Sequence, residues 1–269
     1  MLRLPWPRVP AARLSSSVSK NARCPTPMNL RLSALQPTLR DQLNFPSTVR
    51  TMIAMLRTLV LGLAAALIQT AAADTVHDSE TGLTFSSAFQ LYKSGGHGIT
   101  FRVAIPDDAQ SNTAYDAVVQ VIAPNDVGWA GLAWGGSMPK DPLLISWQGP
   151  SGPVLSSRWA SGHVAPTSYT GAQYTLFRTG TKSNGTHWQF TALCKGCTAW
   201  DSSGSGSGPM RYLNPAGSNR LAFAYSPTKP SGSADANIAV HEVHAYWSHD
   251  FAQARNADFA ATIQRLVGA

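Results

Sequence analysis

The sequence has few charged residues, and those it has are unevenly distributed. Asp, Glu, Lys and Arg make up 13% of the 269 residues, about half of the usual share. The net charge of +7 comes from residues 1–73, which contain nine Lys and Arg residues and the single acid Asp41, whereas residues 74–269 contain twelve basic and thirteen acidic residues. Because the basic character is absent after residue 73, the composition excludes a nucleic-acid-binding face on the folded part.

The chain also lacks an apolar run of membrane-spanning length. The run Leu59–Ile68 would extend only ~15 Å as a helix, about half of the hydrocarbon core of a bilayer. A short basic segment with Arg57 precedes this run, and the small residues Ala71–Ala73 follow it. This order is typical of a secretory signal peptide. We therefore predict a signal peptide at residues 55–73 and a secreted, extracellular protein without a membrane span.

Residues 1–54 contain a single acidic residue, Asp41, and their apolar residues show no clear period. They are rich in Arg, Pro and Ser, a composition that mitochondrial transit peptides share. A start of synthesis at Met52 or Met55 is the simpler explanation, because a signal peptide normally begins the chain. We predict that residues 1–54 are an unstructured extension or a mis-assigned start.

Motifs of several enzyme classes are missing as well. The segment Gly204–Pro209 lacks the last glycine of a dinucleotide-binding fingerprint and lies in a Ser- and Gly-rich stretch instead of a strand-to-helix turn. We find neither a Ser-His-Asp arrangement with motif support nor a paired-carboxylate signature. The sequence therefore identifies no catalytic residue and no flavin domain, which leaves enzymatic activity uncertain.

What the sequence does contain, from Asp74 onward, is a series of short alternating or apolar segments separated by Gly, Pro, Asn and Asp. This spacing indicates an all-β, antiparallel sandwich or barrel, and we expect residues 74–269 to form one domain. Only the tail, Phe251–Val267, has helical spacing, which predicts a short C-terminal helix. The nine segments are Ile99–Ile105, Tyr115–Ala123, Trp129–Trp134, Leu143–Trp147, Val154–Trp159, Tyr174–Arg178, His187–Leu193, Leu221–Tyr225 and Ile238–Phe251.

Two cysteines of this part, Cys194 and Cys197, form a Cys-x-x-Cys motif. A covalent haem attachment requires His after the second cysteine, where this chain has Thr198. A structural zinc site could combine the motif with His241 and His244. In an exported chain, however, two such thiols normally oxidise. We favour a disulfide that closes a tight loop.

The segment Gly128–Pro139 predicts a strand that runs into a Gly-Gly turn and presents the thioether of Met138. The glycines remove side-chain bulk where a flat ligand could approach the backbone. An ordinary core or turn methionine has the same pattern. The segment alone therefore leaves a ligand role for Met138 open.

Three histidines fall within Val240–Asp250. If Ile238–Phe251 is one extended strand, His241 shares an almost wholly apolar face with Val243 and Trp247. A buried imidazole needs a partner, which is either a hydrogen bond or a metal ion. A histidine and a methionine together form the axial pair that raises the potential of a cytochrome. His244 and His249 are equally consistent with solvated side chains or a surface metal site.

At this point the residues resemble a known family. The run from Trp129 to Met138, the segment Ser157–His163, the segment Leu193–Trp200 and the stretch His241–Asp250 are similar, in this order, to the cytochrome domain of fungal cellobiose dehydrogenase. The resemblance extends from about Asp74 to Ala261. It implies an immunoglobulin-like two-sheet β-sandwich that holds one non-covalent haem b.

The resemblance also implies which residues do what. By position, Met138 and His241 would be the axial ligands of the haem iron, and Cys194 and Cys197 would be the paired cysteines of the family. Trp147 resembles the tryptophan beside the haem, although an ordinary core tryptophan has the same pattern. The chain departs from the family at His163, where a tyrosine usually lies near a haem propionate, and at His244, where an aromatic residue is frequent.

The expected protein is a stand-alone, monomeric electron carrier, since a family member with a flavin domain would continue after the cytochrome. We expect transient contacts with a sugar dehydrogenase or small reductant as donor and a copper polysaccharide oxygenase as acceptor. The alternative is a carbohydrate-binding module that has lost its haem and binds sugar on exposed Trp188 or Trp200. The sequon at Asn184 predicts a glycan in either case.

Overall fold

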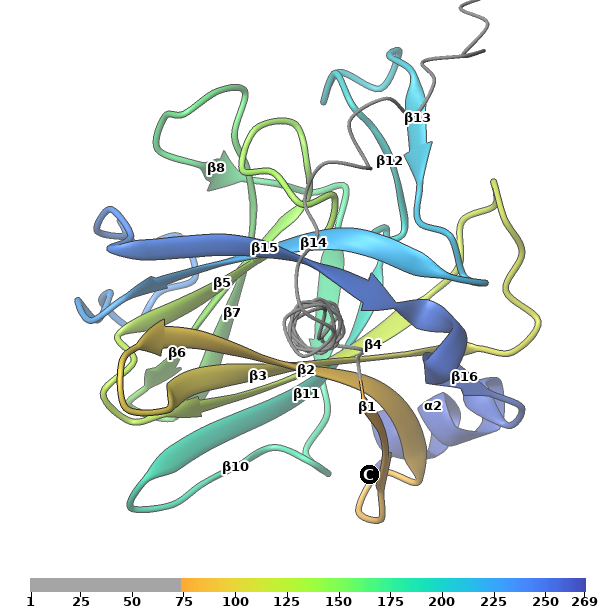
Figure 1. Ribbon diagram of the computed structural model, residues 1–269, viewed down its shortest axis with the longest axis horizontal. Coiled ribbons are helices and arrows are strands. Elements are labelled where there is room, and N and C mark those ends of the chain that lie inside the picture. The colour runs from red at the N-terminus through yellow and green to blue at the C-terminus, as the bar shows by residue number, and fades with distance from the viewer. Residues whose placement is uncertain (1–73) are drawn as a thin grey trace, which may run out of the picture. The chain divides into compact units, whose positions relative to one another are not determined.

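The computed structural model describes residues 74–269, which form a sandwich of two antiparallel β-sheets with one short α-helix near the C-terminus (Figure 1). This architecture confirms the predicted all-β fold with its helical tail. The predictions for residues 1–54 and 55–73 lie outside the described residues. Within residues 74–269, no helix has the length and hydropathy that a membrane crossing requires.

The first sheet has eight strands, and its main path follows the order β1-β2-β3-β4-β11-β10. Two further strands join it at the sides: β9 pairs with β11, and β16 pairs in parallel with β3. The strands are β1 (Asp74–Asp78), β2 (Leu83–Lys93), β3 (His97–Pro106), β4 (Ala117–Pro124), β9 (Gln173–Leu176), β10 (Lys182–Ser183), β11 (His187–Lys195) and β16 (Arg255–Asn256).

The second sheet has six strands in the order β15-β14-β5-β6-β7-β8. They are β5 (Trp129–Ala133), β6 (Leu143–Gly149), β7 (Gly152–Trp159), β8 (Thr167–Ser168), β14 (Ser218–Ser226) and β15 (Val243–Asp250). A separate hairpin of β12 (Ala199–Asp201) and β13 (Met210–Tyr212) lies beyond the sandwich, at the top of Figure 1.

The main core lies between the two sheets and follows from the alternation of the strands. In β3, for example, Ile99, Phe101 and Val103 are fully buried, and the residues between them face the other side of the sheet. They pack with inward residues of the second sheet such as Leu132 and Phe223 in one hydrophobic cluster. Period-two patterning therefore assigns each strand one face toward the core.

The C-terminal tail is only partly helical, which corrects the expectation of one helical segment over Phe251–Val267. It begins with a 3₁₀ turn, η2 (Phe251–Ala254), continues through β16 and ends in α2 (Phe259–Val267). The interruption has a local cause, because the side chain of Asn256 exchanges hydrogen bonds with the backbone of Thr84 in β2 and thereby draws the chain against the first sheet.

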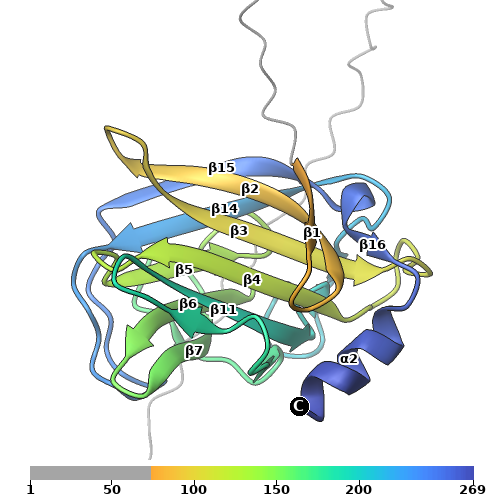
Figure 2. The ribbon, with the colours of Figure 1, turned by 90° about the horizontal axis from the view of Figure 1, so that it is seen from below.

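Helix α2 covers part of the outer face of the first sheet. Its buried residues Phe259 and Leu266 pack against Leu83, Phe85 and Val118 in a second hydrophobic cluster. Figure 2 shows α2 beside one end of this sheet, with the second sheet behind it. The helix therefore leaves the outer face of the second sheet untouched.

Each of the nine expected segments contains a strand, but the long strand β2, its partner β1 and the short strands β8, β10, β12, β13 and β16 were not expected. In β2 the alternation of Leu83 and Phe85 is interrupted by Ser86 and Ser87, which weakens its hydrophobic pattern. The last expected segment is also too long, because β15 begins at Val243 and not at Ile238. His241 consequently lies in the loop before the strand.

Candidate functional site

The outer face of the second sheet carries four small residues side by side. Ala222 of β14 pairs with Ala133 of β5, and Ala224 pairs with Gly131. Directly paired residues in an antiparallel sheet project to the same face, so these four form a trough two strands wide, which we call the small-residue trough. A Cβ atom added to Gly131 would already lie 3.1 Å from the Trp129 ring and 3.3 Å from Ile145.

Larger side chains border the trough on both sides. On β6, Leu143 pairs with Ala133 and Ile145 pairs with Gly131. On β15, Tyr246 pairs with Ala222 and His244 pairs with Ala224. The four small residues are therefore flanked by two aliphatic side chains along one edge and by an aromatic ring and an imidazole along the other.

Met138 lies at one end of the trough. It belongs to the loop between β5 and β6, is half-buried, and packs against a small cluster that includes Ala133, Leu143, Ala160 and Ala222. The loop can turn tightly because Gly136 has a φ of +78°, a conformation that glycine adopts without steric cost. The sequence-predicted thioether is thus at the border of the trough.

His241 lies in the loop that joins β14 to β15, residues 227–242. The backbone N–H of Glu242 donates a hydrogen bond to the Tyr225 carbonyl, 2.8 Å away, and this bond ties the end of the loop to β14. Ala236 and Ile238 of the same loop pack against the cluster of Trp129, Ile145 and Trp147. The loop therefore covers part of the same outer face that carries the trough.

Arg158 of β7 anchors this loop. Its side chain is 5% exposed, and its Nη2 donates to the carbonyl oxygens of Ala234 at 2.7 Å and Ala236 at 2.8 Å. Its Nε donates to Ser156 Oγ. These hydrogen bonds offset the cost of burying the guanidinium, and they hold the loop in one position.

The structure brings three sequence-predicted histidines together. The ring centroids of His241 and His244 are 4.9 Å apart. Burial lowers the pKa of His241, and the nearby imidazoles of His244 and His163 lower it further. His241 is half-buried, whereas His163 and His244 are exposed. Because neutral imidazole is the form that binds metals, the surroundings of His241 favour a ligand state.

Two tryptophans on the same outer face as the trough have buried N–H groups that lack a partner within residues 74–269. Trp147 is fully buried and Trp129 is 2% exposed, and both belong to the cluster with Ile145. Neither Nε1 atom has a hydrogen-bond partner among the described residues. An unpaired buried N–H costs ~1–3 kcal/mol, so each of these groups could donate to a ligand.

The cysteine motif is a disulfide, as favoured from the sequence. Cys194 and Cys197 are bonded to each other, so the alternative zinc site with His241 and His244 is wrong, because neither cysteine has a free thiolate to bind a metal. Residues 74–269 also contain no group of three or more His, Cys, Asp or Glu side chains arranged to hold a metal ion.

The expected sugar platform is also wrong. Trp188 is fully buried and Trp200 is 3% exposed, because both rings pack in the core between the sheets. Trp200 instead donates from Nε1 to the carbonyl oxygen of Lys140, 3.1 Å away, in the loop of Met138.

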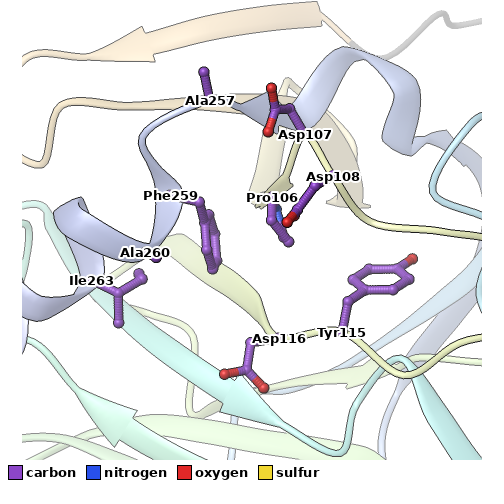
Figure 3. Close-up of a pocket in the computed structure, with 9 residues that line it drawn as sticks. All are labelled: Pro106, Asp107, Asp108, Tyr115, Asp116, Ala257, Phe259, Ala260 and Ile263. Atoms are coloured by element: carbon purple, nitrogen blue, oxygen red, sulfur yellow. The ribbon is translucent and has the colours of Figure 1, made fainter.

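Two cavities lie outside the trough. One, of about 550 Å³, is lined by Arg220, Tyr246, Trp247 and Ser248 beside the β15 edge of the trough. The other has a volume of about 420 Å³. It is surrounded by the rings of Tyr115 and Phe259 and by the carboxylates of Asp107, Asp108 and Asp116 (Figure 3). It contains none of the sequence-predicted site residues.

Sequence reasoning missed the residues that shape the site. The alternation of large and small residues in Leu-Ala-Phe-Ala-Tyr of β14 predicts only a strand. The small residues at its outward positions are also a sign that a ligand can approach the sheet there, and the sequence-based prediction did not use it. The roles of Arg158 and Asp141 were not predicted, because the carbonyl groups that Arg158 binds and the guanidinium of Arg211 that meets Asp141 lie far away in the sequence.

Comparison with known proteins adds an independent line of evidence. The profile of the cytochrome domain of cellobiose dehydrogenase matches residues 76–261. A pyrroloquinoline quinone-dependent pyranose dehydrogenase of Coprinopsis cinerea is 30% identical over 197 residues, which cover 72% of this chain and 26% of that protein. The chain thus matches about a quarter of the length of this relative.

Two solved structures share the fold. The cytochrome b domain of pyranose dehydrogenase from Coprinopsis cinerea has a TM-score of 0.61 and 27% identity, and the match covers 74% of this chain and 97% of that domain. The cytochrome domain of Myriococcum thermophilum cellobiose dehydrogenase has a TM-score of 0.63 and 22% identity, with 72% and 96% covered. The chain belongs to the family of cellobiose dehydrogenase cytochrome domains.

Proposed function

We propose that this chain is a b-type cytochrome that transfers single electrons, with Met138 and His241 as axial ligands of one haem on the outer face of the second sheet. Membership of the cytochrome-domain family supports the electron-transfer role. The single observation that carries the site is the arrangement around the small-residue trough, where the Met138 loop and the His241 loop meet the same face of the sheet.

The residues present fit a flat, largely apolar group. Gly131, Ala133, Ala222 and Ala224 place little side-chain bulk on this face of the sheet, and Leu143 and Ile145 add an apolar wall. Such a surface suits a porphyrin, whose faces are apolar and whose edge carries two carboxylates.

The polar atoms of the site also fit. The half-buried imidazole of His241 is held largely neutral, and the thioether of Met138 lies at the border of the trough. The N–H groups of Trp129 and Trp147 need acceptors. We assign Trp147 as a haem contact and place His163 and His244 at the haem edge, where their exposure leaves them in water.

A haem held in this way supplies a one-electron couple, and two protein ligands leave its iron no open coordination position. In such a site Met138 and His241 would bind the iron, and the surrounding apolar residues would exclude water from it. The exposed His163 and His244 mark the side at which a redox partner approaches. This division favours electron transfer over reactions at the iron.

The direct test is the visible spectrum of the reduced protein. The wild type should show the sharp α band of a six-coordinate b-type haem, and Met138→Ala or His241→Ala should abolish it by removing an axial ligand. His97→Ala changes an exposed histidine of the first sheet and should leave the band unchanged. His244→Ala should also keep it. Loss in His244→Ala with retention in His241→Ala would reassign the ligand.

The proposed role also includes an electron donor and an electron acceptor. A relative is a sugar dehydrogenase that contains a matching domain, which supports a sugar dehydrogenase as electron donor in transient contact with a monomer. We further propose a copper polysaccharide oxygenase as acceptor, in the degradation of plant cell walls. Oxidation of reduced cytochrome, followed in a stopped-flow experiment with each candidate partner, tests these assignments.

Secretion and glycosylation belong to the same proposal. The disulfide of Cys194 and Cys197 is consistent with an oxidising compartment. Asn184 is exposed in the turn between β10 and β11, and its Oδ1 accepts a hydrogen bond from the Thr186 N–H at 2.8 Å. Mass spectrometry of protein from a secreting host would detect both the removal of residues 1–73 and a glycan on Asn184.

A further inference from the structure

Asp141 is a buried carboxylate in the loop that carries Met138. Its side chain is 0% exposed, and it lies three residues after Met138 and two before β6. Charged side chains are almost never fully buried unless they are paired. The contacts of the Asp141 carboxylate should therefore explain why a charged side chain is buried in this loop.

The carboxylate of Asp141 occupies the inside of this loop. Its Oδ2 accepts a hydrogen bond from the backbone N–H of Ser137, 2.9 Å away. A Cβ atom at Gly135 would lie only 2.3–2.5 Å from the carboxyl atoms, so glycine is the residue that leaves them space. The carboxylate thus binds the peptide unit that joins Gly136 to Ser137, one residue before Met138, and occupies the space beside Gly135.

A second segment closes on the loop from outside. Arg211 of β13 approaches Oδ1 of Asp141 at 3.3 Å from a half-exposed position. Its neighbour in the hairpin, Trp200 of β12, donates to the Lys140 carbonyl, and Lys140 donates from its N–H to the Ala160 carbonyl at 2.8 Å. Four separate contacts therefore restrain residues 135–141.

The electrostatic surroundings match this arrangement. Burial raises the pKa of Asp141 to about 6, whereas the Ser137 N–H and the charges of Arg211 and Arg220 act in the opposite direction. Arg220 also packs against the loop, because a Cβ at Gly136 would lie 2.4 Å from its Cγ. Two guanidinium groups on different strands thus offset one buried negative charge.

We propose that Asp141 is a positioning residue that holds the Met138 loop in the conformation in which the thioether remains bound to the haem iron. This inference rests on the proposed function and adds a residue that contacts neither haem nor iron. Without the carboxylate, the Ser137 N–H and Arg211 lose their partner, and the loop gains freedom to move Met138 away.

The test measures how readily Met138 leaves the iron. Carbon monoxide binds reduced haem only at an open axial position, so the wild type should not bind it and Met138→Ala should. Asp141→Ala should increase the rate of carbon monoxide binding about tenfold or more, a factor that corresponds to ~1.4 kcal/mol. Its midpoint potential should also fall toward that of Met138→Ala, because methionine ligation raises the potential.

Two further variants separate positioning from general damage. Asp141→Asn keeps an acceptor for the Ser137 N–H but loses the ion pair with Arg211, so its carbon monoxide binding should be slower than that of Asp141→Ala and faster than that of the wild type. Asp108→Ala removes an exposed aspartate in the turn after β3 and should behave as wild type. A folded, haem-loaded Asp141→Ala with the wild-type potential and no carbon monoxide binding would overturn the inference.

If Asp141→Ala does not fold, Arg211→Met tests whether Asp141 positions the Met138 loop. Arg211 is half-exposed, so the substitution should allow folding while it breaks the ion pair with Asp141. Faster carbon monoxide binding in this variant supports the inference, and wild-type behaviour refutes it. Failure of the proposed function has a different signature, because wild-type protein would then lack the haem spectrum altogether.

Discussion

His249 is buried where β15 faces β2, and its two ring nitrogens have protein partners. Nδ1 accepts a hydrogen bond from Trp247 Nε1 at 2.9 Å, and Nε2 donates to the Ser86 carbonyl at 3.2 Å. Burial lowers its pKa to about 4, although the Ser86 carbonyl and the charge of Asp250 act in the opposite direction. The sequence left His249 as a solvated or surface metal-binding side chain, and the structure shows a neutral core histidine instead.

The lowered pKa of His249 predicts a loss of stability in acid. The unfolded chain binds a proton near pH 6.5 and the folded one only near pH 4, so stability is retained above 6.5 and falls as the pH decreases from 6.5 to 4. The loss should be on the order of 3 kcal/mol. Urea unfolding at pH 7 and pH 4.5 measures it, and His249→Gln should reduce the difference between the two pH values.

Asp141 provides an opposing contribution in the same pH range. Its folded pKa is raised to about 6, so its contribution to stability is largest at low pH and declines as the pH rises through 6. Because Asp141 is present in both proteins, the comparison of wild type with His249→Gln cancels it. An identical pH dependence in the two proteins would contradict the assignment to His249.

At the level of elements, the second sheet differs from the first in how its outer face is covered. Helix α2 packs on the first sheet, whereas the second sheet is covered only in part, by the loop of residues 227–242. In β14 the inward residues Leu221 and Phe223 are buried, and the outward ones between and after them are Ala222 and Ala224. One strand thus contributes both to the core and to the trough.

Filling the trough should prevent haem binding without unfolding the domain. Ala224→Phe places a ring over the half-exposed position that pairs with Gly131, where the haem would lie. We expect the absorbance ratio of haem to protein to fall by about tenfold or more, which corresponds to ~1.4 kcal/mol, while the circular dichroism spectrum is retained. Thr100→Phe, on the outer face of the first sheet, is the matched control and should leave haem content unchanged. Normal haem loading of Ala224→Phe would place the haem elsewhere.

At the level of the whole molecule, the helix and the proposed site lie on opposite outer faces of the sandwich. The core between the sheets joins them, α2 stabilises one outer face, and the proposed site occupies the other. The contacts of α2 with the rest of the chain are on β2, β3 and their neighbours. A change in the helix should therefore alter the free energy of unfolding but not the spectrum.

Adjacent residues of α2 offer a matched pair for this prediction. Leu266 is 2% exposed and Val267 is 54% exposed. Leu266→Ala should lower the free energy of unfolding by about 2–3 kcal/mol, because it opens a cavity in a packed cluster, and Val267→Ala should change it by less than about 0.5 kcal/mol. Urea unfolding gives both values. Equal effects would show that α2 does not depend on the sheet beneath it, and a shifted haem band in either variant would link the two faces.

Much of the fold could be predicted because its signals are local. Alternation within short segments identified nine strands, and the spacing of Cys194 and Cys197 in an exported chain favoured the disulfide that the structure contains. Met138 in its Gly-rich segment and the histidines near β15 were candidates from neighbouring residues, and the family resemblance supplied their expected roles as ligands. Period-two patterns and short motifs need no knowledge of distant parts of the chain.

The tertiary structure alone decided which residues surround those candidates. Burial of Trp188 and Trp200, the trough made by β14 and β5, the anchoring of the loop of residues 227–242 by Arg158, and the ion pair of Asp141 with Arg211 all join segments far apart in the sequence. Each depends on strand order and register, because pairing determines which side chains share a face and which backbone groups a buried charge can reach. The sequence by itself determined the strands and the candidate ligands, and the packing of two sheets determined where a ligand finds space.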